Sequence, residues 1–176
     1  MKIQSNEIIS VKVKSIEQYG VLVEADGYEG IVLIPNLSWN IYGVQKGMSN
    51  YFSIGDILDA MVLDSSTVPF NASFKDAHPE LSPWNKVSKY LINTIHKAKV
   101  VTRTDFGYFL ELEKGLRVLL HNEKSIPEMS EGEIVSVKIN SIDQEKKKIV
   151  VSYVFPENIW HPEKNIMFLA QGISFF

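Results

Sequence analysis

Four side chains in the second half of the sequence could together bind a nucleic acid. Phe106 and Phe109 flank Gly107, and His121 ends the next apolar run. Successive side chains of a strand point to opposite faces, but a glycine often marks a bulge. A bulge at Gly107 would bring both rings to one face. Two aromatic rings, an imidazole and the nearby cation of Arg103 would then form a platform on which bases stack.

The alternative is that both phenylalanines are core residues, which is where most phenylalanines lie. The local sequence favours neither interpretation, but the pattern occurs a second time. Tyr19-Gly20-Val21-Leu22-Val23-Glu24 precedes an apolar run in the first half, as Phe106-Gly107-Tyr108-Phe109-Leu110-Glu111 does in the second. The spacing of 87 residues from Gly20 to Gly107 predicts two complete small domains and not short solenoid units.

Length and composition restrict the class of protein. The chain has 176 residues, enough for one domain or two small ones, and no cysteine. It therefore has no disulfide and no thiolate metal site, which is compatible with a reducing compartment. The N-terminus lacks a signal-peptide core, and the apolar stretch at 166–176 is too short to span a bilayer. We expect a soluble, cytoplasmic protein without a membrane partner.

The net charge of −3 hides an asymmetry between the halves. Residues 1–80 carry five basic and ten acidic side chains, whereas residues 81–155 carry twelve basic and nine acidic ones. A basic half suits contact with phosphate and an acidic half repels it. An imbalance of this size is also compatible with two ordinary solvated surfaces.

Alternating apolar and polar residues predict five short strands in each half. In the first half a long connection, 39–53, separates the third strand from the fourth, which is the order of an OB-type barrel. Two prolines and the helical spacing of Trp84, Val87 and Tyr90 predict a short helix between the halves. The predicted fold is all-β, with two tandem five-stranded OB-fold barrels joined by a short helical linker. The predicted segments are a first barrel at 1–78, a linker at 79–93, a second barrel at 94–155 and a tail at 156–176.

Both copies resemble the RNA-binding domain repeated in the large protein S-one of the bacterial small ribosomal subunit, which also occurs in polynucleotide phosphorylase and ribonuclease E. In the first copy, Ser73-Phe74-Lys75 and the later Pro83-Trp84 resemble the family's inter-repeat signature. The second copy matches the family motif in order at Phe106-Gly107-Tyr108-Phe109, His121, Gly132-Glu133, Asp143, Lys148 and Ile149 to Ser152.

The resemblance implies single-stranded RNA as the partner of the second barrel, because only unpaired bases present a free face for stacking. Phe106 and Phe109 would stack on bases, and His121 would stack or form a hydrogen bond. Asp143 would order its hairpin or accept a hydrogen bond from a base. The cations expected to contact phosphates are Arg103, Lys147 and Lys148. Tyr108 stands where the family usually has a small residue.

The first copy has lost most of this set. Leu22 replaces the second aromatic residue, Leu33 replaces the histidine, and only Tyr19 remains. Each base that is no longer stacked forfeits about 1–3 kcal/mol. The first barrel is therefore predicted to be a degenerate RNA binder that serves as a spacer or docks a protein.

A second interpretation is a protein-interaction module that acts on a ribosome or another ribonucleoprotein without strong RNA binding of its own. Aromatic residues enrich protein interfaces, and Trp39, Tyr42 and Tyr51 lie in the long connection of the first barrel. Together with Tyr19, they are the candidates for weak or protein contacts. Enzymatic activity is not expected, because the four histidines are scattered and no nucleophile–base motif or phosphate loop occurs. No cofactor or metal is predicted.

Overall fold

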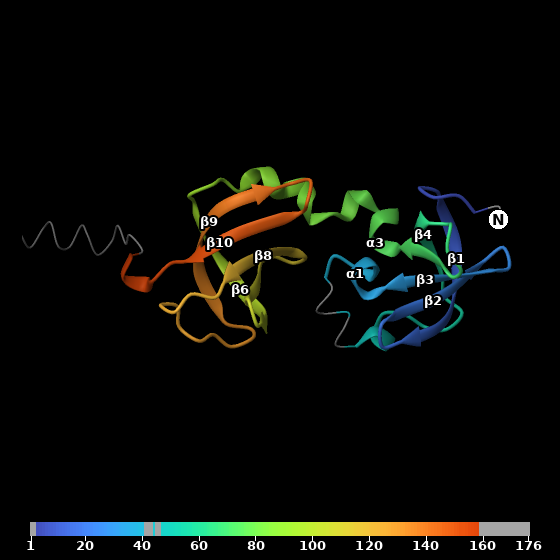
Figure 1. The fold of residues 1–176 in the computed structure, drawn as a ribbon, viewed down its shortest axis with the longest axis horizontal. Coiled ribbons are helices and arrows are strands. Elements are labelled where there is room, and N and C mark those ends of the chain that lie inside the picture. The colour runs from blue at the N-terminus through green and yellow to red at the C-terminus, as the bar shows by residue number, and fades with distance from the viewer. Residues whose placement is uncertain (1–2, 41–43, 45–46, 159–176) are drawn as a thin grey trace, which may run out of the picture. The chain divides into compact units, whose positions relative to one another are not determined.

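The computed structural model describes residues 3–40, 44 and 47–158. The chain divides into two compact units, each built around one closed five-stranded barrel (Figure 1). The predicted fold class is confirmed. Among the described residues, no helix is both long and apolar enough to cross a membrane.

The first barrel has the strand order β1-β2-β3-β5-β4. Neighbouring strands are antiparallel except β3 and β5, which run parallel. Short helices follow the third and fifth strands and occupy the long connection. The elements are β1 Ile8–Glu17, β2 Gly20–Ala25, β3 Tyr28–Leu33, α1 Ile34–Leu37, η1 Met48–Asn50, β4 Ile57–Asp64, β5 Phe70–Ser73 and α3 Phe74–Ala77.

The second barrel repeats this order as β10-β8-β7-β6-β9. Here the parallel pair is β8 and β10. Within the described residues, a short 3-10 helix follows the last strand. The elements are β6 Ile95–Thr104, β7 Gly107–Glu113, β8 Leu116–His121, β9 Ile134–Asp143, β10 Lys148–Tyr153 and η4 Pro156–Asn158.

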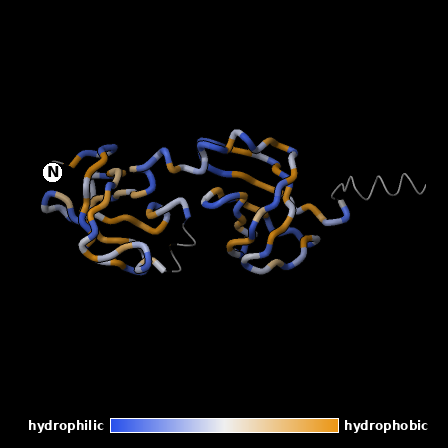
Figure 2. Tube along the Cα trace, turned by 180° about the vertical axis from the view of Figure 1, so that it is seen from behind, coloured by the Kyte–Doolittle hydropathy of each residue, from blue (hydrophilic) through white to orange (hydrophobic). Residues whose placement is uncertain are grey.

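Apolar residues at alternate strand positions fill each barrel, as the alternating colours along the strands in Figure 2 show. Each fully buried aliphatic side chain contributes about 1.5–3 kcal/mol relative to exposure. The largest fully buried side chains are Phe70, Leu110, Leu116, Leu120, Ile139, Ile149, Val11, Val13, Val21, Val23, Val32 and Val62.

The linker is helical, as predicted, but its helices are of the 3-10 type: η2 Pro79–Leu81 and η3 Pro83–Lys89. A proline lacks the backbone N–H that an α-helical ladder requires beyond the first turn, and short 3-10 turns are common connectors. Trp84 in η3 is half-buried.

One register irregularity recurs in both barrels. In β1 it lies between Val13 and Ser15, and in β6 between Val100 and Thr102. Each of these long strands pairs with two neighbours, and a bulge bends a strand so that it can serve both. The bulge expected at Gly107 is therefore wrong: Gly107 is the first residue of β7, and the irregularity lies in the strand paired with it.

Gly107 and Gly20 instead permit a close approach between strands. A Cβ atom at Gly107 would lie 2.2 Å from the carbonyl oxygen of Leu120, and one at Gly20 would lie 2.2 Å from that of Val32. Only a residue without a side chain fits at this distance. The two glycines thus hold the start of β2 against the end of β3, and the start of β7 against the end of β8.

Candidate nucleic-acid interface

Phe106 and Phe109 lie on the same outer face of the second barrel. Their ring centroids are 5.9 Å apart and the planes meet at 88°, an edge-to-face pair. Phe106 is 55% exposed and Phe109 is half-buried. Phe106 belongs to the turn before β7, so strand alternation does not apply to it. Phe106 is thus outside the core. The expectation that the two rings share a face is confirmed, but the turn places them there and not the expected bulge at Gly107.

His121 lies beside this pair. It is exposed at the end of β8, and its Cα would be 3.0 Å from a Cβ atom at Gly107. The next residue fixes the position, because the Asn122 N–H donates to the Phe106 carbonyl oxygen at 3.0 Å. The backbone of β8 therefore places the imidazole next to the start of β7. We name the exposed surface of Phe106, Phe109 and His121 the aromatic face.

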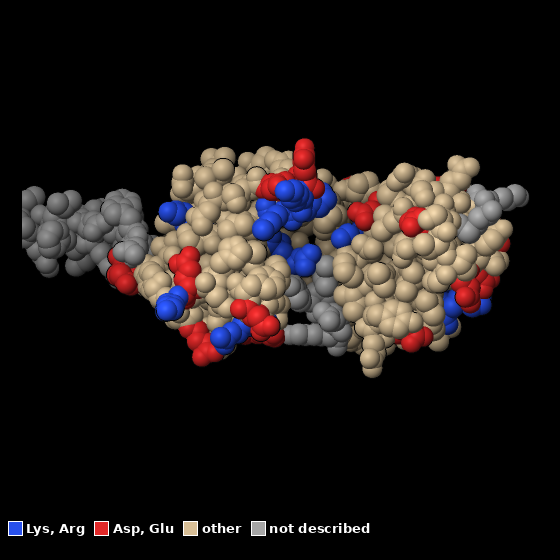
Figure 3. Space-filling model, in the orientation of Figure 1, with Lys and Arg blue, Asp and Glu red and all other residues tan. Residues whose placement is uncertain are grey.

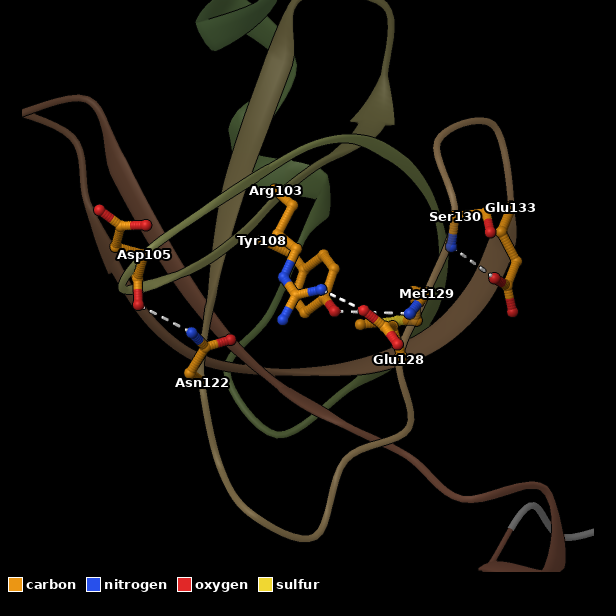
Figure 4. Close-up of polar contacts among 8 residues, drawn as sticks. All are labelled: Arg103, Asp105, Tyr108, Asn122, Glu128, Met129, Ser130 and Glu133. Carbon is orange, nitrogen blue, oxygen red and sulfur yellow. Dashed lines mark hydrogen bonds and ion pairs between the residues drawn. The ribbon is translucent and has the colours of Figure 1, made fainter.

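Arg103 is held between an aromatic ring and a carboxylate, as Figure 4 shows. Its guanidinium carbon lies 5.7 Å from the centroid of the Tyr108 ring. It also forms an ion pair with Glu128, in which the side chains are 57% and 78% exposed. Tyr108 itself is 2% exposed, and its hydroxyl oxygen accepts from the Met129 N–H at 3.4 Å.

A cavity of about 370 Å³ opens beside Arg103. Asn122 links it to the aromatic face, because this residue bonds to Phe106 through its backbone and lines the cavity. The Asn122 side-chain amide also donates to the Asp105 carbonyl oxygen at 2.9 Å. The lining residues are Arg103, Tyr108, Asn122, Glu123, Lys124, Ile126, Pro127 and Glu128.

Sequence reasoning did not assign Tyr108, Asn122 or Glu128 to the site. Tyr108 carried a signal, since it departs from the small residue that the family usually has at this position. Glu128 carried none, because it meets Arg103 across 25 residues of chain and in a segment without periodicity.

The basic residues of the β9–β10 turn lie farther along the barrel. Asp143 faces Lys148 across the hairpin, and its Oδ1 accepts from the Lys146 N–H at 2.9 Å. Lys147 is exposed and adopts a left-handed conformation, with φ 50°. In this geometry Asp143 orders the turn that presents Lys147 and Lys148.

The turn is separated from the aromatic face by the length of a strand. Val150 of β10 pairs with Leu119 of β8 in parallel, so the same register places Lys148 near the start of β8, whereas His121 ends it. Four residues of strand correspond to about 13 Å. The structure therefore brings Phe106, Phe109 and His121 together and leaves Lys147 and Lys148 on a continuation of the same surface.

The first barrel has the same backbone geometry with different side chains. The Ile34 N–H donates to the Tyr19 carbonyl oxygen at 3.0 Å, just as Asn122 donates to Phe106. Tyr19 is 52% exposed, Leu33 is exposed and Leu22 is half-buried. The predicted equivalences of Leu22 with Phe109 and of Leu33 with His121 agree with this geometry.

An ion pair lies on the same barrel, between Lys14 of β1 and Glu24 of β2, with 2.6 Å between the Lys14 Nζ and the Glu24 Oε2. The hydrogen bond from Lys14, followed by its charge, lowers the pKa of Glu24, and the same contacts raise the pKa of Lys14. Lys14 is thus bound to a carboxylate.

The aromatic residues of the long connection differ in environment. Trp39 is half-buried, and the Lys75 Nζ lies 4.8 Å from its ring centroid. Tyr51 is exposed, which is the condition under which it could contact a protein partner. Tyr42 lies outside the described residues.

Charges are mixed on the face of the second barrel that Figure 3 shows, where basic side chains lie next to acidic ones. Several basic side chains gather at one margin of that face with acidic ones beside them, and the others lie singly among acidic side chains. Contact with a polyanion would depend on individual cations and their neighbours.

Comparison with known proteins identifies a family for each half. Residues 2–67 match the S1 RNA binding domain family, and residues 92–139 match a second S1 domain family. The small ribosomal subunit protein bS1 of Helicobacter pylori is 31% identical over 166 residues, covering 86% of this chain and 28% of that protein. The bS1 of Coxiella burnetii is 28% identical over 158 residues, covering 84% of this chain and 28% of that protein.

A protein named 4-hydroxy-3-methylbut-2-enyl diphosphate reductase, from Clostridium acetobutylicum, is 29% identical over 160 residues. The match covers 86% of this chain and 24% of the reductase. The chain thus spans about a quarter of the length of these curated relatives. Among solved structures, GSP13 from Bacillus subtilis matches with 22% identity and a TM-score of 0.37, over 48% of this chain and 64% of that one.

Proposed function

Since the chain belongs to the S1 domain family, with one domain in each half, we propose that its second barrel binds single-stranded RNA. The RNA lies across the outer surface of β7 and β8. Unpaired bases stack on Phe106 and Phe109, with His121 beside them. The phosphates of the RNA backbone are attracted by Arg103, Lys147 and Lys148.

The exposed aromatic pair carries the proposal. A phenylalanine that is 55% exposed does little for the core, and its edge-to-face contact with Phe109 fixes both rings before a ligand arrives. Rings that are already in place bind without a further cost of ordering their side chains. Arg103 lies in the strand that pairs with β7, and the β9–β10 turn lies about a strand's length from the aromatic face. On this proposal, an RNA of several nucleotides reaches both sets of cations.

We place this activity in translation or RNA metabolism, because bS1 proteins are among the relatives. Association with a ribosome or another ribonucleoprotein follows from the same relationship. The reductase relative shares only a quarter of its length with this chain, so its activity is not carried over. The proposed role is binding without catalysis.

A second candidate is protein interaction by the first barrel. Tyr19 and Leu33 form an exposed apolar surface where the second barrel has its aromatic face, and Tyr51 is exposed as well. Apolar and aromatic surface of this kind is typical of protein interfaces. On this proposal the first barrel is a spacer or docks a protein while the second holds the RNA.

A titration of the full chain with a short, labelled, single-stranded RNA tests the proposal. Phe106→Ala should weaken binding by about 1–3 kcal/mol if one base stacks there. Tyr19→Ala is the matched control, since Tyr19 is 52% exposed at the equivalent position of the first barrel, and it should change the affinity little. Equal losses from the two variants would contradict the assignment to the second barrel.

The same titration at several salt concentrations tests the backbone contacts. If Arg103, Lys147 and Lys148 neutralise three phosphates, the logarithm of the binding constant should fall against the logarithm of salt with a slope of about −2, at about 0.7 per phosphate. An affinity that does not change with salt would instead favour the protein-interaction candidate.

A further inference from the structure

Arg103, one of the cations proposed to bind RNA, is already paired with a carboxylate of the chain itself. Arg103 comes from β6 and Glu128 from the connection between β8 and β9, and their side chains form an ion pair. Glu128 is 78% exposed, and 12 residues, 122–133, separate β8 from β9. The carboxylate thus reaches the guanidinium from a segment outside the strands.

The guanidinium has a second contact besides Glu128. Its carbon lies 5.7 Å from the centroid of Tyr108, and that ring is buried and hydrogen-bonded to the Met129 backbone. A guanidinium over a ring still offers its N–H donors in a planar fork, which suits a carboxylate or a phosphate. Tyr108 therefore keeps Arg103 in position when the anion changes.

The ion pair is weak enough to exchange. Both partners are more than half exposed, and an exposed pair typically contributes only about 0–1 kcal/mol. The cavity beside it, of about 370 Å³, is also lined by the cation of Lys124, by Asn122 and by a second carboxylate, Glu123. A phosphodiester that displaces Glu128 would meet the guanidinium of Arg103 and the cation of Lys124. Asn122 connects this cavity to Phe106 through its backbone hydrogen bond.

We propose that this cavity is a phosphate subsite of the RNA track and that Glu128 is its placeholder. In the free protein Glu128 neutralises Arg103, and the phosphodiester next to the base stacked on Phe106 displaces it. The inference rests on the proposed RNA binding by the second barrel, and it names a residue that opposes that binding.

Glu128→Gln tests the displacement. Removal of the competing carboxylate should strengthen binding of short single-stranded RNA to the full chain by up to about five-fold, the upper end of the range expected for an exposed ion pair. Glu123→Gln is the matched control, because it removes the same charge from another residue that lines the cavity. The thermal unfolding midpoint should stay unchanged in both variants, since both side chains are exposed.

The background of Arg103→Gln separates displacement from a general effect of charge. There Glu128→Gln should strengthen binding no more than Glu123→Gln does, because the guanidinium for which anions compete is gone. If Glu128→Gln and Glu123→Gln act equally in the otherwise unchanged chain, the placeholder is refuted and RNA binding still stands. If the unchanged chain does not bind RNA, the proposed function fails and the subsite fails with it.

Discussion

Phe109 is expected to contribute both to the packing of the second barrel and to RNA binding. It is half-buried and its ring meets that of Phe106 edge to face. The first barrel has Leu22 at this position, so a leucine is compatible with this surface of the fold. We expect Phe109→Leu to weaken RNA binding by about 1–3 kcal/mol and to lower the free energy of unfolding by much less than the about 3–5 kcal/mol of a core phenylalanine truncated to alanine. RNA titration and urea unfolding of the same preparation measure the two effects.

A loss of stability in the core range without a loss of affinity would assign Phe109 to the core alone. Phe106→Ala helps to interpret the result, because Phe106 is more exposed and its removal should affect affinity with little change in unfolding.

The sequence allowed the aromatic face to be predicted because its residues are fixed by local features. A turn, a glycine and the end of an apolar run place Phe106, Phe109 and His121, and all three features are visible within 16 residues. The ion pair between Arg103 and Glu128 depends instead on how a connection of irregular structure folds back. No periodicity marks such a contact, so only the structure reveals it.

At the scale of elements, the close approach of β7 to β8 determines whether the aromatic face exists. A methyl group at Gly107 would lie 2.2 Å from the Leu120 carbonyl oxygen, and backbone at this distance has to move. We expect Gly107→Ala to destabilise the second barrel by at least the about 1–3 kcal/mol typical of overpacking and to abolish most RNA binding, because His121 moves away from Phe106. Chemical unfolding and RNA titration provide the measurements.

Gly20→Ala serves as the control, since the clash with Val32 is the same in the first barrel. It should destabilise that barrel and leave RNA binding nearly intact below its unfolding transition. Equal losses of RNA binding from the two substitutions would show that binding needs both barrels.

The strands themselves were predictable, because apolar and polar residues alternate along a strand that has one buried and one exposed face. The bulges were not, because they lie within β1 and β6, where no glycine or proline marks them. A bulge at these positions bends a long strand that pairs with one neighbour along its first half and with another along its second half. Prolines in the linker signalled its position but not its 3-10 geometry.

At the scale of the whole chain, the two barrels are duplicates in backbone and differ in their surfaces. They share the strand order, the parallel pair and the bulge. They also share the hydrogen bond from the residue after β3 or β8 to the residue before the glycine that begins β2 or β7. The division of labour proposed for them must therefore lie in side chains. That conclusion can be tested by giving the first barrel the missing side chains and measuring whether it gains RNA affinity.

Leu22→Phe together with Leu33→His should give the first barrel the missing members of the aromatic face beside Tyr19. Both leucines are at least partly exposed, so the new aromatic side chains have space on the outside of β2 and β3. In the full chain carrying Phe106→Ala, we expect this pair of substitutions to recover part of the lost RNA affinity. Recovery should be incomplete, because the first barrel has no basic residue just before β5 and its Lys14 is bound to Glu24. RNA titration of the combined variant measures the gain, with Leu33→His alone as the control. An affinity no higher than that of Phe106→Ala would show that the cations of the second barrel, and not its aromatic face, set the division.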